Sequence, residues 1–86
     1  MVTIHKFTLP VHPGKVELTL PAHSRFLTLA VQHGIPVAYF EVDSTQPNTI
    51  ETFWLYETGR EHRILGHYRG TVLLLGDRYV LHLYKV

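Results

Sequence analysis

The sequence contains no cysteine. This absence excludes disulfide bridges, thiolate zinc sites and a cysteine nucleophile, and it argues against a small secreted fold held together by disulfides. No apolar run approaches the ~18 residues that a membrane-spanning helix needs, and the first residues lack the apolar segment and cleavage site of a signal peptide. We therefore expect a soluble, unprocessed chain that works in a reducing compartment and does not bind a membrane.

An excess of charge of either sign is also missing. Eight Lys and Arg residues stand against seven Asp and Glu residues, for a formal net charge of +1. Recognition of an anion must therefore be local, because the chain as a whole does not attract nucleic acid or an acidic surface. With 45% hydrophobic and 17% charged residues, the composition is typical of a chain that folds. At 86 residues it forms one domain, 1–86, with a modest core.

Sustained helical periodicity is absent, whereas apolar residues alternate with period two between Gly- and Pro-containing turns. This pattern predicts an all-β fold, a single small antiparallel domain of about six or seven strands. Short connections suggest a meander that closes into a sandwich or a partly open barrel, although a short helical turn at 24–27 is an alternative to the start of one strand. Gly34 and the Gly76-Asp77 pair mark hairpin turns. The strands are expected near 2–9, 15–20, 25–33, 36–43, 50–57, 67–75 and 78–85.

Several of these strands are apolar on both faces. In 53–56 and in 79–84, apolar side chains occupy odd and even positions alike. One face of a two-layer domain is normally wet, so either neighbouring segments or a second copy of the chain must cover the outer face. Because little chain is left for covering, we predict a homo-oligomer. The expected interface residues are Tyr39, Trp54, Tyr56, Leu81 and Leu83.

Seven histidines raise the question of a metal site. Their spacing contains neither H-x-H nor H-E-x-x-H, and the closest pair, His62 and His67, would point to opposite faces of a strand. We therefore expect no metal ion and no cofactor. For His82, on the last strand, we expect ring nitrogens satisfied by a hydroxyl or carbonyl group.

The sequence features of common catalytic sites are missing too. No G-x-S-x-G motif surrounds either serine, and no glycine-rich phosphate-binding loop occurs. Glu51 and Glu57 would lie about 20 Å apart along a strand, which is too far for the carboxylate pair of a glycosidase. We predict that the protein is not an enzyme.

The basic segment 58–69 follows the aromatic-rich strand expected at 50–57 and is the candidate binding site. A glycine there can adopt positive φ, so that backbone amides turn inward, and guanidinium groups match phosphate or carboxylate oxygens. The segment also has an alternative interpretation as a solvated connection, because Glu57 and Glu61 would pair with the same arginines. The candidate ligand-binding residues are Thr58, Gly59, Arg60, Arg63 and Arg69.

Four stretches resemble a family of short, functionally uncharacterised proteins found mostly in tailed bacteriophages. They are LTLAVQHGIPVAYFEVD at 27–43, YETG at 56–59, YRGTV at 68–72 and YVLHLY at 79–84. The family commonly has a tryptophan where this sequence has Tyr39 or Phe40. The resemblance implies a phage origin and an accessory role, without naming an activity. The shared residues are Thr58, Gly59, Gly70, Thr71 and His82, of which Gly70 suggests a bulge or a close backbone approach.

From these observations we expect a phage-encoded, non-enzymatic binding protein that sequesters or blocks a host factor, as in host takeover or anti-defence. The partner would be a small anionic molecule or a host protein in the host cytoplasm. In the first case Arg60 and Arg63 would neutralise phosphate while Tyr56 or Trp54 stacks on a base. Two alternatives stay open: a minor virion or assembly protein, and a single-stranded nucleic-acid-binding module, although the near-zero charge argues against nucleic acid.

Overall fold

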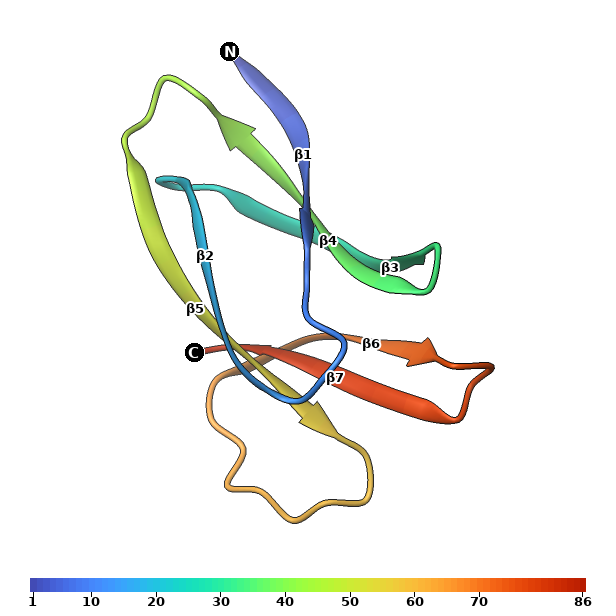
Figure 1. The fold of residues 1–86 in the computed structure, drawn as a ribbon. Helices are drawn as coiled ribbons and strands as arrows, with labels where there is room; N and C mark the ends of the chain where they lie inside the picture. The colour runs from blue at the N-terminus through green and yellow to red at the C-terminus, as the bar shows by residue number, and fades with distance from the viewer.

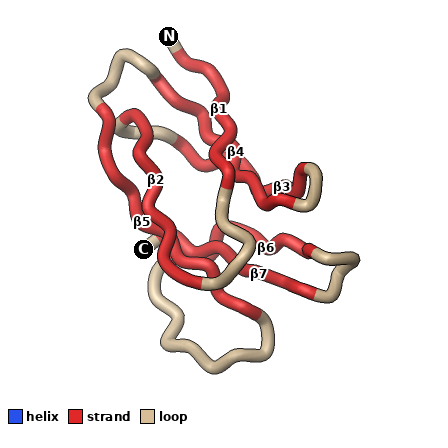
Figure 2. Tube along the Cα trace, viewed as in Figure 1, coloured by secondary structure: helices blue, strands red, loops and turns tan.

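A computed structural model describes residues 1–86 as seven β-strands without a helix, which confirms the all-β prediction (Figures 1 and 2). Each strand begins and ends within two residues of its expected position. None of the chain forms a helix of the length and apolar character that crossing a membrane requires. The strands are β1 (Val2–Thr8), β2 (Gly14–Pro21), β3 (Arg25–Gln32), β4 (Ile35–Asp43), β5 (Asn48–Glu57), β6 (His67–Leu74) and β7 (Tyr79–Lys85).

The strands form two antiparallel sheets packed as a sandwich, which does not close into a barrel. One sheet has three strands in the order β1-β4-β3, and the other has four in the order β2-β5-β7-β6. The expected meander is wrong, because β1 pairs with β4 and β2 pairs with β5, so that the chain crosses between the layers. Alternation in a sequence shows which residues share a face, but it does not show which strand lies next to which.

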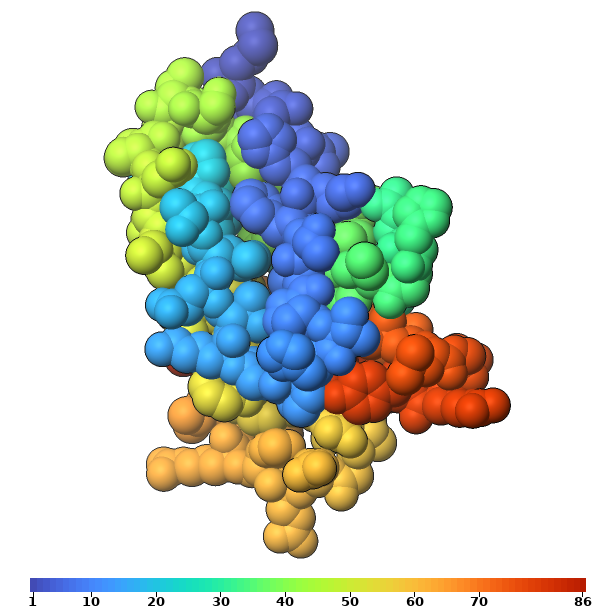
Figure 3. All heavy atoms as spheres, in the orientation of Figure 1, coloured from blue at the N-terminus to red at the C-terminus, as the bar shows by residue number.

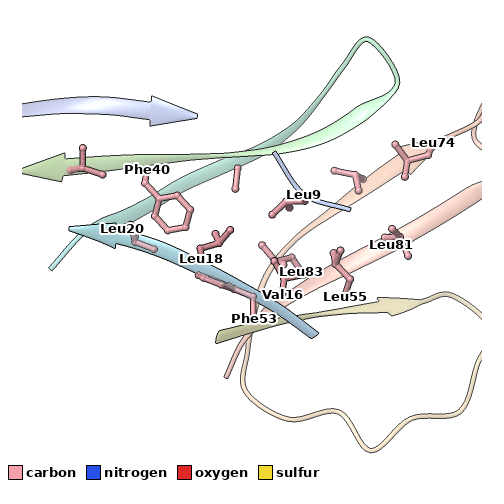
Figure 4. Close-up of a cluster of buried hydrophobic side chains, with 13 residues drawn as sticks. Leu9, Val16, Leu18, Leu20, Phe40, Phe53, Leu55, Leu74, Leu81 and Leu83 are labelled. Carbon is pink, nitrogen blue, oxygen red and sulfur yellow. The ribbon is translucent and has the colours of Figure 1, made fainter. Parts of the chain in front are cut away.

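The core fills the space between the two sheets (Figure 4). Phe40 from the three-stranded sheet meets Phe53 from the four-stranded sheet edge to face, with ring centroids 5.9 Å apart. Leu55, Leu81 and Leu83 are fully buried beside them. Alternate residues of β2, β4, β5 and β7 therefore face inward, as the period-two pattern predicts. The complete cluster is Leu9, Val16, Leu18, Leu20, Ala38, Phe40, Val42, Phe53, Leu55, Val72, Leu74, Leu81 and Leu83.

The two expected hairpins are present. His33 and Gly34 have φ of 53° and 77°, which is the left-handed pair that a two-residue type I′ turn needs between β3 and β4. Gly76 and Asp77 lie in the connection between β6 and β7, with φ of 64° and 69°. These turns set the register of both hairpins, which fixes which side chains of β7 face outward.

For Gly70 we expected a bulge or a close backbone approach, and the structure shows both. The register of β6 against β7 shifts between Tyr68 and Gly70. A side chain at Gly70 would lie 3.0 Å from the Cδ1 atom of Leu29, which reaches across from β3 in the other sheet. The bulge also changes the alternation along β6, so that Tyr68 and Thr71 both stand opposite outward-facing residues of β7.

Candidate ligand-binding site

The loop that carries the candidate site begins in a tight turn at the end of β5. The backbone N–H of Arg60 donates to the Glu57 carbonyl at 3.5 Å, and Gly59 has φ of 87°, where glycine carries no steric penalty. We call residues 58–66, which connect β5 to β6, the covering loop. Figure 1 shows it on the side of the four-stranded sheet that faces away from β1, β4 and β3.

Tyr56 holds the covering loop against the outer face of the sheet. Its hydroxyl accepts a hydrogen bond from the backbone N–H of Leu65 at 3.1 Å and donates one to the Arg63 carbonyl at 3.4 Å. The ring of His62 lies 5.1 Å from the Tyr56 ring. As a result, Tyr56 is only 6% exposed although it follows the inward-facing Leu55 along the strand. The chain's own loop therefore buries an aromatic residue that was expected to contact a second copy.

Aromatic side chains continue across the outer face beneath and beside this loop. The strand register places Trp54 opposite Tyr84, and Tyr84 opposite Tyr68. Ring centroids lie 5.5 Å apart for Tyr68 and Tyr84, and 5.3 Å apart for Tyr56 and Tyr84, both edge to face. Such pairs contribute about 0.5–1.5 kcal/mol each beyond the area they bury, so these rings form a rigid floor.

A chain of hydrogen bonds runs beside the aromatic floor and centres on His82. The Nε2 atom of His82 lies 2.6 Å from the Thr58 hydroxyl, and its Nδ1 atom lies 2.9 Å from the Thr71 hydroxyl. The Tyr68 hydroxyl lies 2.5 Å from the Thr71 hydroxyl. A neutral imidazole donates from one nitrogen and accepts at the other, and a hydroxyl can play either role. The expectation that hydroxyl groups satisfy His82 is confirmed, and Thr58, Thr71 and His82, which the phage resemblance groups together, are neighbours in space.

Two hollows lie on either side of Tyr56 and His62. The larger pocket has a volume of about 340 Å³ and is bounded by Tyr56, Glu57, Thr58, Gly59, Arg60, His62, Ile64, His82 and Tyr84. The smaller has a volume of about 190 Å³ and is bounded by Trp54, Tyr56, His62, Arg63 and Leu65. Figure 3 shows the covering loop projecting from the body of the molecule, in yellow and orange, at the end opposite the N-terminus.

Charges of both signs meet at the larger pocket. The Nε atom of Arg60 lies 3.5 Å from a carboxylate oxygen of Glu57, which is the contact expected of a solvated loop. Partial burial raises the pKa of Tyr79, the negative charge of Glu57 raises it further, and the positive charge of Arg60 opposes them. An exposed ion pair is worth only about 0–1 kcal/mol, so an anionic ligand competes with Glu57 for Arg60 at small cost.

The structure brings some of the expected ligand-binding residues together and separates others. Thr58, Gly59 and Arg60 bound the larger pocket. Arg63 bounds the smaller pocket and makes no ion pair. Arg69 bounds neither pocket, because it occupies the bulge of β6, where its guanidinium donates to the carbonyl of Tyr68 at 3.4 Å. Arg69 was expected to bind a ligand because of its charge, but its position in the sheet does not bring it to either pocket.

The expected interface residues do not form one surface. Leu81 and Leu83 are fully buried in the core between the sheets, so their assignment to an interface is wrong (Figure 4). Tyr39 lies in β4, in the other sheet, and faces away from the core there. Tyr56 is covered by the loop. Of the five expected interface residues, only Trp54, which is half-buried, remains on the outer face of the four-stranded sheet. The error arose because a strand that is apolar on both faces does not reveal which face is inside.

Apart from Tyr56, which was expected to stack on a base, the candidate ligand-binding residues left out five residues of the larger pocket: Glu57, His62, Ile64, His82 and Tyr84. His82 was noted as one of the residues shared with the phage family, but no spacing in the sequence connects β7 with the end of β5. Their proximity follows from the pairing of β5 with β7, which places Tyr56 opposite His82. No group of three or more His, Asp or Glu side chains is arranged so that it could hold a metal ion.

Comparisons with known proteins place the chain in a family without assigning it an activity. No curated protein and no solved structure matches it. A family model described as "Domain of unknown function (DUF7352)" matches residues 1–86, the whole length of the chain. The protein therefore belongs to the DUF7352 family.

Proposed function

We propose that this protein is a phage-encoded, non-enzymatic binding protein that captures a small anionic ligand in the larger pocket and so sequesters a host molecule in the host cytoplasm. The observation that carries the proposal is the convergence of Thr58, Arg60 and His82 on a pocket walled by tyrosines. Ligand sites are typically concave and largely apolar, with a few polar groups that fix orientation. The volume of about 340 Å³ lies at the small end of their usual range of roughly 300–1,000 Å³.

The chemistry of the lining favours an anion joined to a planar ring. Arg60 offers a guanidinium fork, Thr58 a hydroxyl, and the turn at Gly59 exposes backbone close to the pocket. The planar part has a place in the smaller pocket, where Trp54 and Arg63 lie together. Aromatic and guanidinium faces both stack on nucleobases. A single nucleotide has this combination of ring and phosphate.

The state of His82 supports binding over catalysis. Both of its ring nitrogens are engaged by threonine hydroxyls, and no carboxylate accepts a hydrogen bond from it. A general base in a nucleophilic site is normally oriented by a third polar group and aimed at a reacting atom. Here the imidazole links the start of the covering loop, β6 and β7 instead, which rigidifies the wall of the pocket. The phage origin rests on the resemblance of stretches such as 27–43 and 79–84.

One observation favours a second candidate, a surface for single-stranded nucleic acid. Lys15, Trp54, Tyr84 and Tyr68 stand in one cross-strand row over the four-stranded sheet, and rows of aromatic residues stack successive bases in such surfaces. The two candidates differ in what they bind. A mononucleotide suffices for the pocket, whereas the row requires an oligonucleotide, and its binding weakens steeply with added salt.

The test uses the single tryptophan as a reporter. Trp54 lines the smaller pocket, so its fluorescence responds to a planar ligand bound beside it. Titration with adenosine and guanosine monophosphates, with inorganic phosphate and oligothymidine as comparisons, is expected to show saturable quenching by a mononucleotide. Replacing Arg60 by Gln removes a charge-assisted contact worth about 1.5–3 kcal/mol, so the dissociation constant should rise roughly 10–100-fold.

Arg78→Gln is the matched control, since Arg78 is an exposed arginine in the β6–β7 connection that bounds neither pocket. It should bind as the wild type does. Native mass spectrometry of the purified protein supplies an independent measurement by revealing a co-purifying ligand. A wild-type protein that carries no co-purifying mass and shows no quenching by any of these probes contradicts the proposal, as does an equal effect of the two arginine substitutions.

A further inference from the structure

The two sheets have four edges, formed by β1, β3, β2 and β6. An edge strand presents unpaired N–H and C=O groups, and proteins usually protect such a strand with a bulge, a proline or a charged side chain. β3 has a bulge between Phe26 and Thr28, and β6 has one between Tyr68 and Gly70. β2 ends in a proline and alternates Lys15 with Glu17 along its outer face. Three of the four edges are therefore protected.

β1 is the exception, because its one charged side chain is directed away from the free edge. Its seven residues pair with β4 in unbroken register, without a bulge or proline. Its single charged residue, Lys6, donates from Nζ to the Oε1 atom of Gln32 at 2.6 Å. Because Gln32 belongs to β3 on the far side of β4, this side chain crosses over β4 and leaves the edge uncovered. Val2 and Ile4 on the same strand are 59% and 60% exposed.

The direction of the free backbone groups follows from the pairing. The backbone N–H of Leu9 donates to the Pro36 carbonyl at 2.9 Å, in continuation of the β1–β4 register. In an antiparallel pair, residues that bond to the partner strand alternate with residues whose N–H and C=O groups point away from it. The odd positions of β1 therefore bond to β4. The even positions, Val2, Ile4, Lys6 and Thr8, point their backbone groups outward, and we call them the open edge.

We propose that the open edge pairs antiparallel with the open edge of a second copy of this chain, joining two three-stranded sheets into one of six strands. The strand is self-complementary in this arrangement. With the two-fold axis at His5, the midpoint of Val2–Thr8, Ile4 stands opposite the partner's Lys6, and Val2 stands opposite the partner's Thr8. All four outward residues then form hydrogen-bonded pairs. No two like fixed charges face each other, which antiparallel pairing would penalise.

The inference is independent of the proposed ligand site. The covering loop and both pockets belong to the four-stranded sheet, whereas the open edge belongs to the three-stranded sheet. The pairing surface also differs from the aromatic face that the sequence had suggested for self-association. A dimer built through β1 leaves Trp54 and the pocket of each copy free.

Size-exclusion chromatography with light scattering tests the proposal on the full chain. The wild type should elute with twice the chain mass of 9.9 kDa. Ile4→Lys adds a protective charge to the open edge next to Glu41, its neighbour on β4, and should yield a folded monomer by circular dichroism. Ile50→Lys, at an isoleucine of similar exposure (62%) on β5, should remain a dimer. A monomeric wild type, or a dimer that persists in Ile4→Lys, overturns the proposal.

The register has its own test, because the chain contains no cysteine. Opposed residues in a non-hydrogen-bonded antiparallel pair have Cα atoms about 4.5 Å apart, within the disulfide range of roughly 4.4–6.8 Å. His5→Cys should therefore form a disulfide-linked dimer under mild oxidation. In the proposed register Ile4 stands opposite the partner's Lys6 and not opposite the partner's Ile4, so Ile4→Cys should not form a disulfide-linked dimer. Ile50→Cys, which lies in the other sheet, should not form one either. Cross-linking of all three variants to the same extent, or of none, contradicts the proposed pairing.

Discussion

Gly66 shows how strongly one residue constrains the candidate site. It ends the covering loop with φ of 91°, and a Cβ atom there would overlap the backbone carbonyl of Lys85 at the end of β7. The loop can return to β6 only by passing directly against the last residues of the chain. Glycine is required here both for its backbone conformation and for its lack of a side chain.

We predict that Gly66→Ala lowers the free energy of unfolding by about 1–3 kcal/mol, because it combines left-handed strain with backbone overlap. Urea denaturation followed by circular dichroism measures the change. Gly34→Ala is the matched control, since Gly34 also has positive φ but open space around its Cα atom, and it should cost only about 1 kcal/mol. Equal losses in the two variants would show that crowding against Lys85 has no role.

At the scale of elements, the positions of the strands could be predicted from the sequence, but the pairing of strands within the sheets could not. The alternation in 15–20 is imposed by a core on one side of the sheet, and it appears in the sequence directly. The pairing of β1 with β4 depends on contacts between residues 29 to 41 positions apart, from Thr8 with Val37 to Val2 with Asp43, which no local pattern records. Thr58, Gly59 and Arg60 were found because turn and charge chemistry is local.

The covering loop itself was missed for a related reason. Its contacts with Tyr56 run through the backbone N–H of Leu65 and the backbone carbonyl of Arg63. Every residue has these groups, so nothing in the sequence of 58–66 distinguishes a loop folded onto the sheet from one that extends into solvent. The apolar pair Ile64 and Leu65, both half exposed, was the one available hint.

We predict that Tyr56→Phe releases the covering loop without unfolding the sandwich. The substitution keeps the ring but removes the hydroxyl and with it both hydrogen bonds to the loop. Loss of the bond from the Leu65 N–H, worth about 0.5–1.5 kcal/mol, should speed amide exchange at Leu65 roughly 3–10-fold. Trypsin cleavage after Arg60 and Arg63 should accelerate in parallel. Hydrogen exchange with mass spectrometric detection gives the first readout.

Tyr39→Phe supplies the control for that experiment. Tyr39 lies on the outer face of the other sheet, and its hydroxyl makes no hydrogen bond within the chain. Exchange at Leu65 should be the same in Tyr39→Phe as in the wild type. If Tyr56→Phe also leaves exchange at Leu65 unchanged, the hydroxyl does not hold the loop and the walls of both pockets are less fixed than the geometry indicates.

The whole molecule is thin, with principal extents of 40 × 29 × 15 Å. A single core layer between two sheets leaves most side chains on an outer face or near an edge, and only 16 of 86 residues are buried. Such a domain gains stability from covering its outer surfaces, as small domains generally do. The chain's own loop covers part of one outer face, around Tyr56, and in our proposal a second copy covers the open edge of β1.

At the scale of the whole molecule, we predict that ligand binding and dimer formation can be lost separately, each in its own variant. Trp54→Ala should weaken binding of a mononucleotide, because it removes the stacking surface of the smaller pocket, worth about 1–3 kcal/mol per base, while the dimer stays intact. Ile4→Lys should do the reverse, with binding retained by a monomer. Native mass spectrometry reads subunit count and bound ligand in one spectrum.

If Trp54→Ala becomes monomeric, the aromatic face holds the copies together as the sequence had suggested, and pairing through β1 is wrong. If Trp54→Ala binds the nucleotide as the wild type does, the base does not stack in the smaller pocket, whatever the oligomer.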